Sequence, residues 1–311
     1  MNMNSIKFSV VIPLYNKSEC IERTINSVLQ QSYSADEIVV IDDGSTDDSV
    51  AKVEAMKVPN LKLIRQENQG VSAARNTGAQ HCSNDFMAFL DADDTWTPFF
   101  LSRIADLITR FPNMGLYATR YQKVYGDNEF LDAKIALTRW DACGYEMDNY
   151  FAVAASGDLP FTMSSIVVSK PVFHELGGFP CGEWMGEDQS FYINFAMYSR
   201  IAYTPVIESF YYQGTQNSAC DKAPPQELCP FAERLLDDVK EGRVAEKLKP
   251  MVLKYVGAHI CDLAKRHIQH RSVEYAAQLL THPASRKKPL HWSYYKFVAL
   301  PMAYLNKFKN A

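Results

Sequence analysis

The chain has 311 residues, of which 47% are hydrophobic and 22% are charged, a composition typical of globular proteins with a sizeable buried core. Its formal net charge of -4 disfavours a protein that binds nucleic acid through bulk positive charge. The length suits one large domain or two smaller ones, and the composition excludes disordered, collagen-like and disulfide-scaffold proteins.

Strand-like and helix-like segments alternate over the first hundred residues. Four β-rich runs are predicted to form strands, at 8–13, 38–41, 61–64 and 86–90. Helical spacing of apolar residues follows them, at 21–29, 50–53, 71–81 and 98–108. Asn16 and Glu19 have the spacing of a capping box before the first helix. The alternation predicts βαβ units and an α/β fold, with a Rossmann-like, mostly parallel central sheet flanked by helices.

The second part of the chain is patterned less clearly. Further elements are predicted as strands at 116–124, 165–168 and 201–205, and as a helix at 190–197. Three prolines interrupt residues 220–230, and residues 231–280 then have a helical pattern. We therefore expect an α/β domain over residues 1–220 and a helical C-terminal extension over residues 221–311.

The seven cysteines are scattered, and none are spaced as Cys-x-x-Cys, which indicates reduced thiols rather than a disulfide framework or a zinc site. No apolar run approaches the roughly 18 residues of a transmembrane helix, and no secretory signal is visible. The sequence therefore predicts a cytoplasmic protein without a membrane-spanning helix.

Polar segments follow three of the predicted strands, at 13–16, 42–47 and 91–94. Ligands bind beyond the carboxyl ends of the strands in an open parallel sheet, so at least five carboxylates should converge there. Such a cluster needs a compensating cation, and a divalent metal on Asp91 and Asp93 is an economical solution. Carboxylate oxygens suit Mg²⁺ or Mn²⁺, which normally serve a ligand that carries phosphate.

Each of these motifs also has a purely structural interpretation. Asp-Asp-Gly is commonly a turn, Asp-x-Asp is a common pair, and residues 68–70 could simply close a helix N-terminus. The chain lacks G-x-G-x-x-G after its first strand and lacks G-x-x-x-x-G-K-[ST], which disfavours a dinucleotide-binding or P-loop protein. The order of the motifs and their shared position after predicted strands favour an acidic loop that holds a diphosphate through a metal.

The motifs resemble the signature segments of family 2 glycosyltransferases, inverting enzymes with the GT-A fold, of the type that assembles bacterial surface polysaccharides. The segments that carry the resemblance are 10–16, 42–47, 68–76 and 89–94, with weaker ones at 177–179 and 186–188. The resemblance is close over residues 7–112 and fades after about residue 218. It implies that residues 1–220 form a GT-A domain that binds a nucleotide sugar and catalyses its transfer.

The resemblance also implies roles for individual residues. Nucleotide-binding positions are Pro13, Tyr15, Asn16, Asp42, Asp43, Arg75, Asp91 and Ala92. Asp43 matches the carboxylate that accepts the uracil ring N–H, which implies a UDP-sugar donor, and Pro13 and Tyr15 match the nucleobase wall. Asp93 matches the residue that touches Mn²⁺ or Mg²⁺, while Asp91 belongs to the same metal motif and is expected to hold the ribose.

Inverting transfer is one in-line displacement, so the acceptor hydroxyl needs a carboxylate base. Glu187 and Asp188 resemble the family's acidic pair, which implies Asp188 as base and Glu187 as its orienting partner. The alternative is an acidic pair that merely suits a helix start. Trp184 is a candidate for stacking on the acceptor sugar, or else a buried core residue.

The chain departs from the processive synthases of the family, because residues 211–218 contain no Q-x-x-R-W segment. This difference favours addition of a single sugar to a saccharide or lipid-linked saccharide acceptor. Two other functions stay open. Residues 89–95 also match the D-x-D-x-T pattern of haloacid dehalogenase-like phosphatases, and the fold could serve a non-catalytic nucleotide-sugar-binding or glycan-binding module.

The last 27 residues, 285–311, contain six Lys or Arg residues and no acid, whereas residues 1–284 carry a formal charge of -10. Aromatic residues are interleaved with this basic charge, as in segments that contact anionic membranes. The tail therefore predicts peripheral contact with the inner face of the cell membrane. The alternative is that the aromatic side chains pack on the helical extension and the lysines are solvated.

Overall fold

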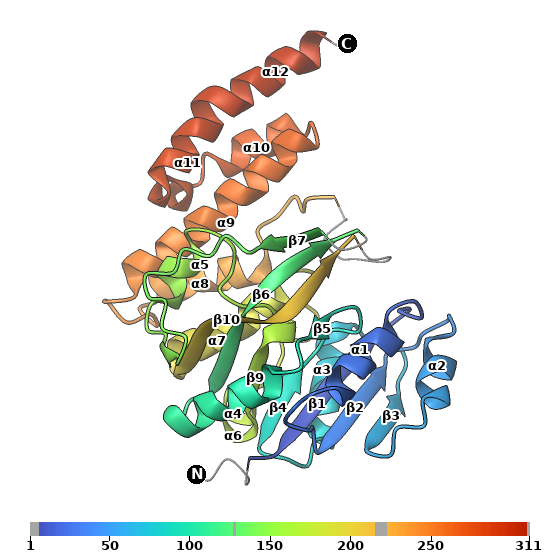
Figure 1. Cartoon of the computed structure of the whole chain (residues 1–311). Helices are drawn as coiled ribbons and strands as arrows, with labels where there is room; N and C mark the ends of the chain where they lie inside the picture. The colour runs from blue at the N-terminus through green and yellow to red at the C-terminus, as the bar shows by residue number, and fades with distance from the viewer. Residues whose placement is uncertain (1–5, 127–128, 215–222, 310–311) are drawn as a thin grey trace. The chain divides into compact units, whose positions relative to one another are not determined.

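The computed structural model describes residues 6–126, 129–214 and 223–309, with side chains described as far as residue 305 (Figure 1). It contains two compact units. Unit 1 comprises residues 1–148, 160–183 and 187–219, and unit 2 comprises residues 149–159, 184–186 and 220–311. Unit 2 therefore includes two short earlier segments besides the expected C-terminal extension. The division into domains at residue 220 stays a prediction.

Unit 1 alternates strands and helices. Its strands are β1 (Phe8–Leu14), β2 (Glu37–Asp42), β3 (Leu61–Arg65), β4 (Phe86–Phe89), β5 (Thr95–Trp96), β6 (Leu116–Tyr125), β7 (Glu129–Asp132), β8 (Tyr145–Glu146), β9 (Ile166–Ser169) and β10 (Ile201–Gln213). Its helices are α1 (Ile21–Leu29), α2 (Ser49–Ala55), α3 (Val71–His81), α4 (Phe100–Arg110), the 3₁₀ turn η2 (Met163–Ser165), α6 (Lys170–Glu175) and α7 (Glu187–Tyr198).

The strands form one sheet in the order β3-β2-β1-β4-β9-β6-β10-β5, with β7 and β8 paired at its side (Figure 1). The pairs β3–β2, β2–β1 and β1–β4 are parallel, as predicted. β9 then runs antiparallel to both β4 and β6, so the second half of the sheet is mixed. The Rossmann-like arrangement is thus confirmed for the half that precedes β9.

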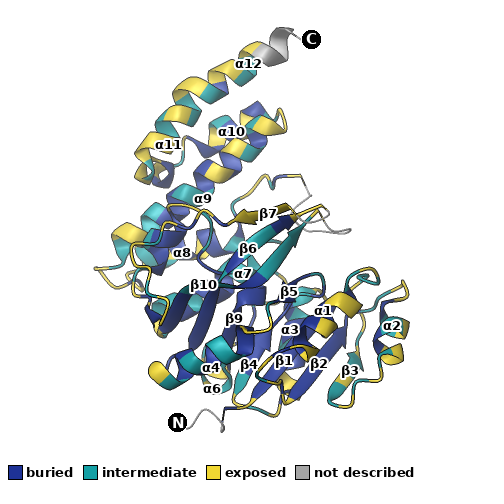
Figure 2. Ribbon diagram, in the orientation of Figure 1, coloured by how far each residue is buried: buried dark blue, intermediate teal, exposed yellow. Residues whose placement is uncertain are grey.

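Burial explains why these strands occupy the centre of the sheet. β1 and β2 are buried at every position (Figure 2), as expected of parallel strands covered on both faces. Val10 and Ile25 share one hydrophobic cluster with Ile104 of α4, while α3 packs against β1 and β2. A Cβ added to Gly78 of α3 would lie 2.4 Å from Cγ1 of Val11, so only glycine permits this approach.

A buried acid joins β1, β2 and the turn before β4. The Glu37 carboxylate accepts hydrogen bonds from Ser9 Oγ at 2.6 Å, from Lys62 Nζ at 2.8 Å and from the Ser83 N–H. Burial alone would raise the pKa of Glu37, but the hydrogen bonds from Lys62, Ser9 and Ser83 outweigh it and lower the pKa to about 2. The ionised carboxylate therefore ties these segments together at neutral pH.

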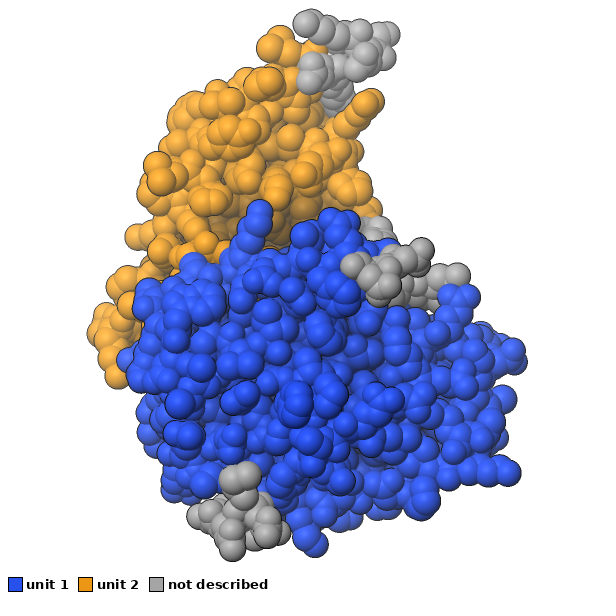
Figure 3. Space-filling model, in the orientation of Figure 1, with its two compact units in different colours: residues 1–148, 160–183, 187–219 blue, residues 149–159, 184–186, 220–311 orange. Residues whose placement is uncertain are grey.

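Unit 2, which is orange in Figure 3, is helical. Its helices are α5 (Tyr150–Ala154), α8 (Pro230–Lys240), α9 (Lys249–Gln269), α10 (Val273–Leu279), η4 (Pro283–Lys287), α11 (Pro289–Tyr294), the π-helical turn η5 (Tyr295–Ala299) and α12 (Leu300–Lys309). The helical pattern predicted over residues 231–280 is thus confirmed. Among the described residues, none of the helices is both long enough and apolar enough to cross a membrane.

Candidate active site

An arginine of α3 joins two acids that lie far apart in the sequence. Arg75 is 2% exposed. Its Nη2 donates to Oδ1 of Asp91, in the loop after β4, at 2.7 Å, and its Nη1 donates to Oδ1 of Asp188, in the first turn of α7, at 2.6 Å. The Asp-x-Asp segment and the acidic pair therefore belong to one site at the end of β4.

The charges within this bridge are strongly coupled. Burial raises the pKa of Asp91 and of Asp188, although the Arg75 charge lowers both. The negative charge of Glu187 raises the pKa of Asp188 further. Burial would lower the pKa of Arg75, but the two neighbouring carboxylates outweigh it and raise that pKa. One guanidinium faces two carboxylates, so the bridge favours retention of the arginine's proton.

A second cation lies beside the other aspartate of the motif. Lys17 Nζ lies 2.7 Å from Oδ2 of Asp93, and Arg23 Nη2 donates to the Asp93 carbonyl at 2.8 Å. The prediction that a metal must balance the acidic cluster therefore missed two protein cations, Lys17 and Arg75. Lys17 directly follows a strand-end motif, so its position carried a signal that the sequence interpretation did not use.

Asp94 is buried beneath this loop. Its carboxylate accepts hydrogen bonds from Ser164 Oγ and from the Tyr212 N–H, and Ser164 Oγ also accepts from the Asp91 N–H at 3.1 Å. Burial, then the charges of Asp93 and Asp91, raise the pKa of Asp94 well above its ordinary value. Asp94 therefore fixes the acidic loop to η2 and β10. Nothing in the spacing of the sequence pointed to Ser164 or Tyr212.

Asp42 and Asp43 organise the neighbouring turns. Asp43 accepts hydrogen bonds from Gln66 Nε2 at 2.7 Å, from the Gln69 N–H at 3.0 Å and from the Gly70 N–H at 2.9 Å. Asp42 Oδ1 accepts from the Ser45 N–H at 3.0 Å. A carboxylate has about four acceptor positions, so Asp43 keeps about one for a ligand. The convergence of all these acids on one crevice stays a prediction.

The candidate residues at the end of β1 differ in burial. Pro13 is buried within the strand, whereas Tyr15 at its end is 44% exposed. Asn16 has a φ of 50°, and its Oδ1 accepts from the Thr46 N–H at 2.8 Å. The predicted capping box at Asn16 is therefore wrong, since α1 begins at Ile21 without a side-chain cap. The Asn16 side chain is instead bound by the turn after β2.

The remaining candidates also have defined places. Ala92 is buried, and its carbonyl accepts from Thr24 Oγ1 at 2.9 Å. Glu187 is the first residue of α7. Trp184 belongs to unit 2 and is 50% exposed, so it is not the core residue of the alternative interpretation. Residues 215–218 of the predicted 211–218 segment lie outside the described residues.

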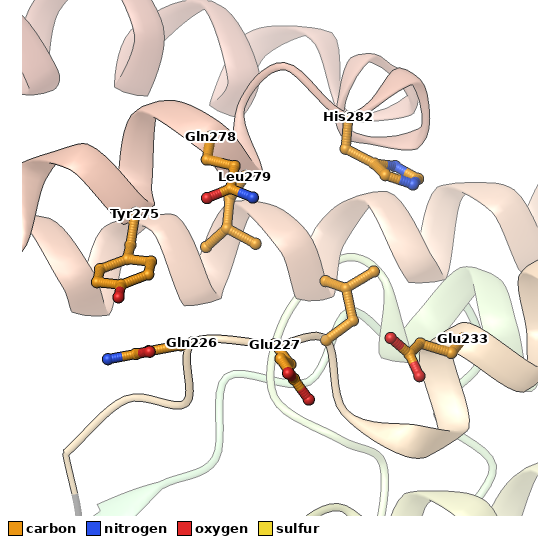
Figure 4. Close-up of a pocket in the computed structure, with 8 residues that line it drawn as sticks. Gln226, Glu227, Glu233, Tyr275, Gln278, Leu279 and His282 are labelled. Atoms are coloured by element: carbon orange, nitrogen blue, oxygen red, sulfur yellow. The ribbon is translucent and has the colours of Figure 1, made fainter.

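Two further observations bear on ligands. Within the described residues, no three His, Cys, Asp or Glu side chains are grouped as a metal site. A separate pocket of about 210 Å³ lies in unit 2 (Figure 4). The side chains that line it include Glu227, Glu233 and His282 but no Lys or Arg, so it suits an anionic diphosphate poorly.

Comparison with known proteins finds glycosyltransferases. The WfgD protein of Escherichia coli, a "UDP-Glc:alpha-D-GlcNAc-diphosphoundecaprenol beta-1,3-glucosyltransferase", is 39% identical over 95 residues, 30% of this chain and 38% of WfgD. The chain likewise spans only about a third of the length of two uncharacterized glycosyltransferases, from Nostoc sp. and Escherichia coli, to which it is 43% and 44% identical over 33% and 31% of its own length.

Two solved structures share the fold. TarS of S. aureus, solved with UDP-GlcNAc, is 18% identical with a TM-score of 0.63, over 94% of this chain and 90% of that one. The mannosyltransferase PcManGT of Pyrobaculum calidifontis, solved with GDP-Man and Mn²⁺, is 19% identical with a TM-score of 0.59, over 97% and 87%. The predicted GT-A fold is thus confirmed. The glycosyl transferase family 2 model matches residues 9–165, half of the chain, and the chain belongs to this family.

Proposed function

We propose that the chain transfers one sugar, with inversion, from a UDP-sugar to a hydroxyl of a saccharide or lipid-linked saccharide acceptor at the cytoplasmic face of the cell membrane. The observation that carries the proposal is the Arg75 bridge, which unites the Asp-x-Asp segment and the acidic pair. The likeness to TarS with UDP-GlcNAc and to WfgD supports the donor and the lipid-linked acceptor. Family membership argues against the phosphatase alternative.

In the proposed mechanism, the acceptor oxygen attacks the anomeric carbon while the bond from that carbon to the diphosphate breaks. Asp188 takes the proton of the acceptor hydroxyl as the new bond forms. Burial and Glu187 raise the pKa of Asp188, which makes it a better base than a solvated carboxylate. Arg75 fixes the orientation of Asp188 through the 2.6 Å contact and acts as a positioning residue.

Asp43 supports a uracil-containing donor in this proposal. Its carboxylate fixes residues 66–70 and keeps about one acceptor position, which suits the single ring N–H of uracil. Tyr15, exposed at the end of β1, offers an aromatic surface for the base. Because PcManGT was solved with GDP-Man, guanosine donors belong in the same test.

The carboxylate oxygens of the site fit a divalent metal that the nucleotide sugar would share. Asp93 offers hard carboxylate oxygens and already lies 2.7 Å from a cation, the Lys17 ammonium. Mg²⁺ in phosphate-binding sites is commonly held by one or two carboxylates together with the phosphates, so a three-acid cluster is not required. Asp93 would hold Mn²⁺ or Mg²⁺, with Asp91 beside it, and the metal would stabilise charge on the leaving diphosphate.

A donor panel tests the proposal. UDP-sugars and GDP-mannose are incubated with Mn²⁺ and candidate acceptors, and the released nucleoside diphosphate is measured. Asp188→Asn should lower turnover by about 10²- to 10⁴-fold while nucleotide still binds. Asp85→Asn is the matched control, because Asp85 is exposed and precedes the opposite end of β4. It should leave turnover unchanged.

Two outcomes would contradict the proposal. If the wild type and Asp188→Asn bind nucleotide but are equally inert with every donor, the chain is a non-catalytic binding module. If the wild type hydrolyses phosphate esters, Asp93→Ala retains that activity and no nucleotide sugar is turned over, the phosphatase alternative returns.

A further inference from the structure

An apolar stripe on α11, η5 and α12 faces the solvent. We call it the C-terminal stripe, and it consists of Leu290, Tyr294, Phe297, Val298, Met302 and Leu305. Leu290 is 83% exposed, and Phe297 and Leu305 are 65% and 63% exposed. Leu290, Tyr294 and Phe297 follow one another at spacings of four and three residues, and so do Val298, Met302 and Leu305, as neighbours on one helical face do. Single exposed apolar residues are ordinary, but a contiguous row of them marks an interaction surface.

Other side chains hold this segment on unit 2. Leu300 is buried, and Trp292 Nε1 donates to the Leu280 carbonyl at 2.9 Å. α12 contacts α10, and α11 and η5 contact α9. The alternative that the tail aromatics pack on the helical region is therefore right for Trp292, whereas the stripe stays exposed even though the Phe297 ring lies 5.6 Å from that of Trp292.

Basic residues accompany the stripe. The guanidinium carbon of Arg286 lies 5.6 Å from the Trp292 ring centre, and Lys296 Nζ lies 5.1 Å from it. Both cations are thus gathered at the segment that carries the stripe. Residues 285–311 contain six Lys or Arg residues and no acid, so nothing in the segment itself neutralises them.

Charge decides which partner fits this surface. A second copy of the chain would bring two segments of six basic residues together, and their charges would repel. An anionic bilayer instead offers hydrocarbon for the stripe and phosphates for the Lys and Arg side chains. We propose that the C-terminal stripe docks on the surface of an anionic lipid membrane.

The proposed function places the enzyme at the membrane without naming the contact, and the docking proposal names the residues that make it. The docking itself does not depend on sugar transfer. Apolar side chains enter the interfacial region, while long basic side chains reach the headgroups. With a lipid-linked acceptor, docking would bring enzyme and acceptor to one surface. With a soluble acceptor, the stripe would still bind lipid.

Co-sedimentation of the full chain with vesicles tests the docking. Binding to vesicles that contain phosphatidylglycerol should exceed binding to phosphatidylcholine alone several-fold, and should weaken as salt is raised. The triple variant Leu290→Ser, Phe297→Ser, Leu305→Ser should bind at least about tenfold more weakly, because three large apolar side chains are lost. Phe99→Ser is the matched control, since Phe99 of unit 1 is 57% exposed and lies outside the stripe.

Three results would overturn the docking: no vesicle binding, equal binding to both lipids, or unchanged binding of the triple variant. A concentration-dependent dimer in analytical ultracentrifugation, abolished in the triple variant and accompanied by no vesicle binding, would assign the stripe to self-association instead. Nucleotide release with soluble acceptors separates this proposal from the proposed function. The triple variant should retain wild-type release, because no stripe residue belongs to the proposed active site.

Discussion

Replacement of Arg75 by methionine tests the central feature of the site. Methionine has a similar length and is apolar, so it fills much of the same space without the charge. The change leaves the carboxylates of Asp91 and Asp188 without the guanidinium that contacts each of them within 2.7 Å. Arg75→Lys is the matched variant, because it retains the positive charge but loses the planar fork that reaches both acids.

The expected cost follows from the burial of the three groups. Loss of one partner from a buried ion pair destabilises proteins by about 3–5 kcal/mol. The Arg75 side chain is 3% exposed, but those of Asp91 and Asp188 are 27% and 36% exposed, so water screens part of the loss. We therefore expect Arg75→Met to lower the free energy of unfolding by about 2–3 kcal/mol, and Arg75→Lys by about half as much.

Urea denaturation followed by circular dichroism gives the free energies, and Asp188→Asn completes a double-mutant cycle. In the Arg75→Met background, Asp188→Asn removes a carboxylate that has lost its partner. The double variant should therefore be more stable than the sum of the single effects predicts, by about 1–2 kcal/mol. A loss below about 0.5 kcal/mol for Arg75→Met, or additive effects in the cycle, would refute the bridge as a coupled structural unit.

Three other changes test separate parts of unit 1. Glu37→Gln removes a carboxylate whose pKa is lowered from 4.5 to about 2. The free energy of unfolding of the wild type should therefore fall by about 3 kcal/mol as the pH falls from about 4.5 to about 2, and acid denaturation of the variant should lack this fall. Gly78→Ala places a Cβ 2.4 Å from Cγ1 of Val11 and should lower the free energy of unfolding by about 1–3 kcal/mol; an unchanged melting temperature would contradict it. Asp43→Ala removes the acceptor of two loop N–H groups and should weaken UDP binding, measured by calorimetry, at least about tenfold, whereas equal affinity would exclude Asp43 from the nucleotide site.

The parallel half of the sheet was predictable because burial leaves a direct mark on the sequence. β2 is enclosed on both faces, so residues 38–41 at its centre are all apolar, and α3 spans the predicted residues 71–81. β10 shows where the same reasoning ends. It was predicted to stop at Pro205, yet it continues to Gln213, and its register with β6 shifts between Thr204 and Ile207. A bulge lets proline stay in a strand, and no local pattern announces it.

The site was predictable as a set of residues but not as a set of contacts. The strand-end rule placed Asp91 at the crevice of the sheet, whereas Asp188 was assigned to the same site by the family resemblance alone. Neither could reveal that one buried arginine contacts both, because side-chain pairing depends on packing between α3, α7 and the loop after β4. The capping box failed for the same reason, since the Thr46 N–H competes for the Asn16 side chain.

The charges of the site then explain why its fit to a metal does not conflict with its internal cations. The formal charges of three cations, Arg75, Lys17 and Arg23, and of four acids, Asp91, Asp93, Asp188 and Glu187, leave one net negative charge. Burial, then the charges of Asp93 and Asp91, raise the pKa of the neighbouring Asp94 well above its ordinary value. A site this close to balance can fold without a metal, yet it still repels a bare diphosphate. A divalent cation held by Asp93 would compensate the charge of such a diphosphate.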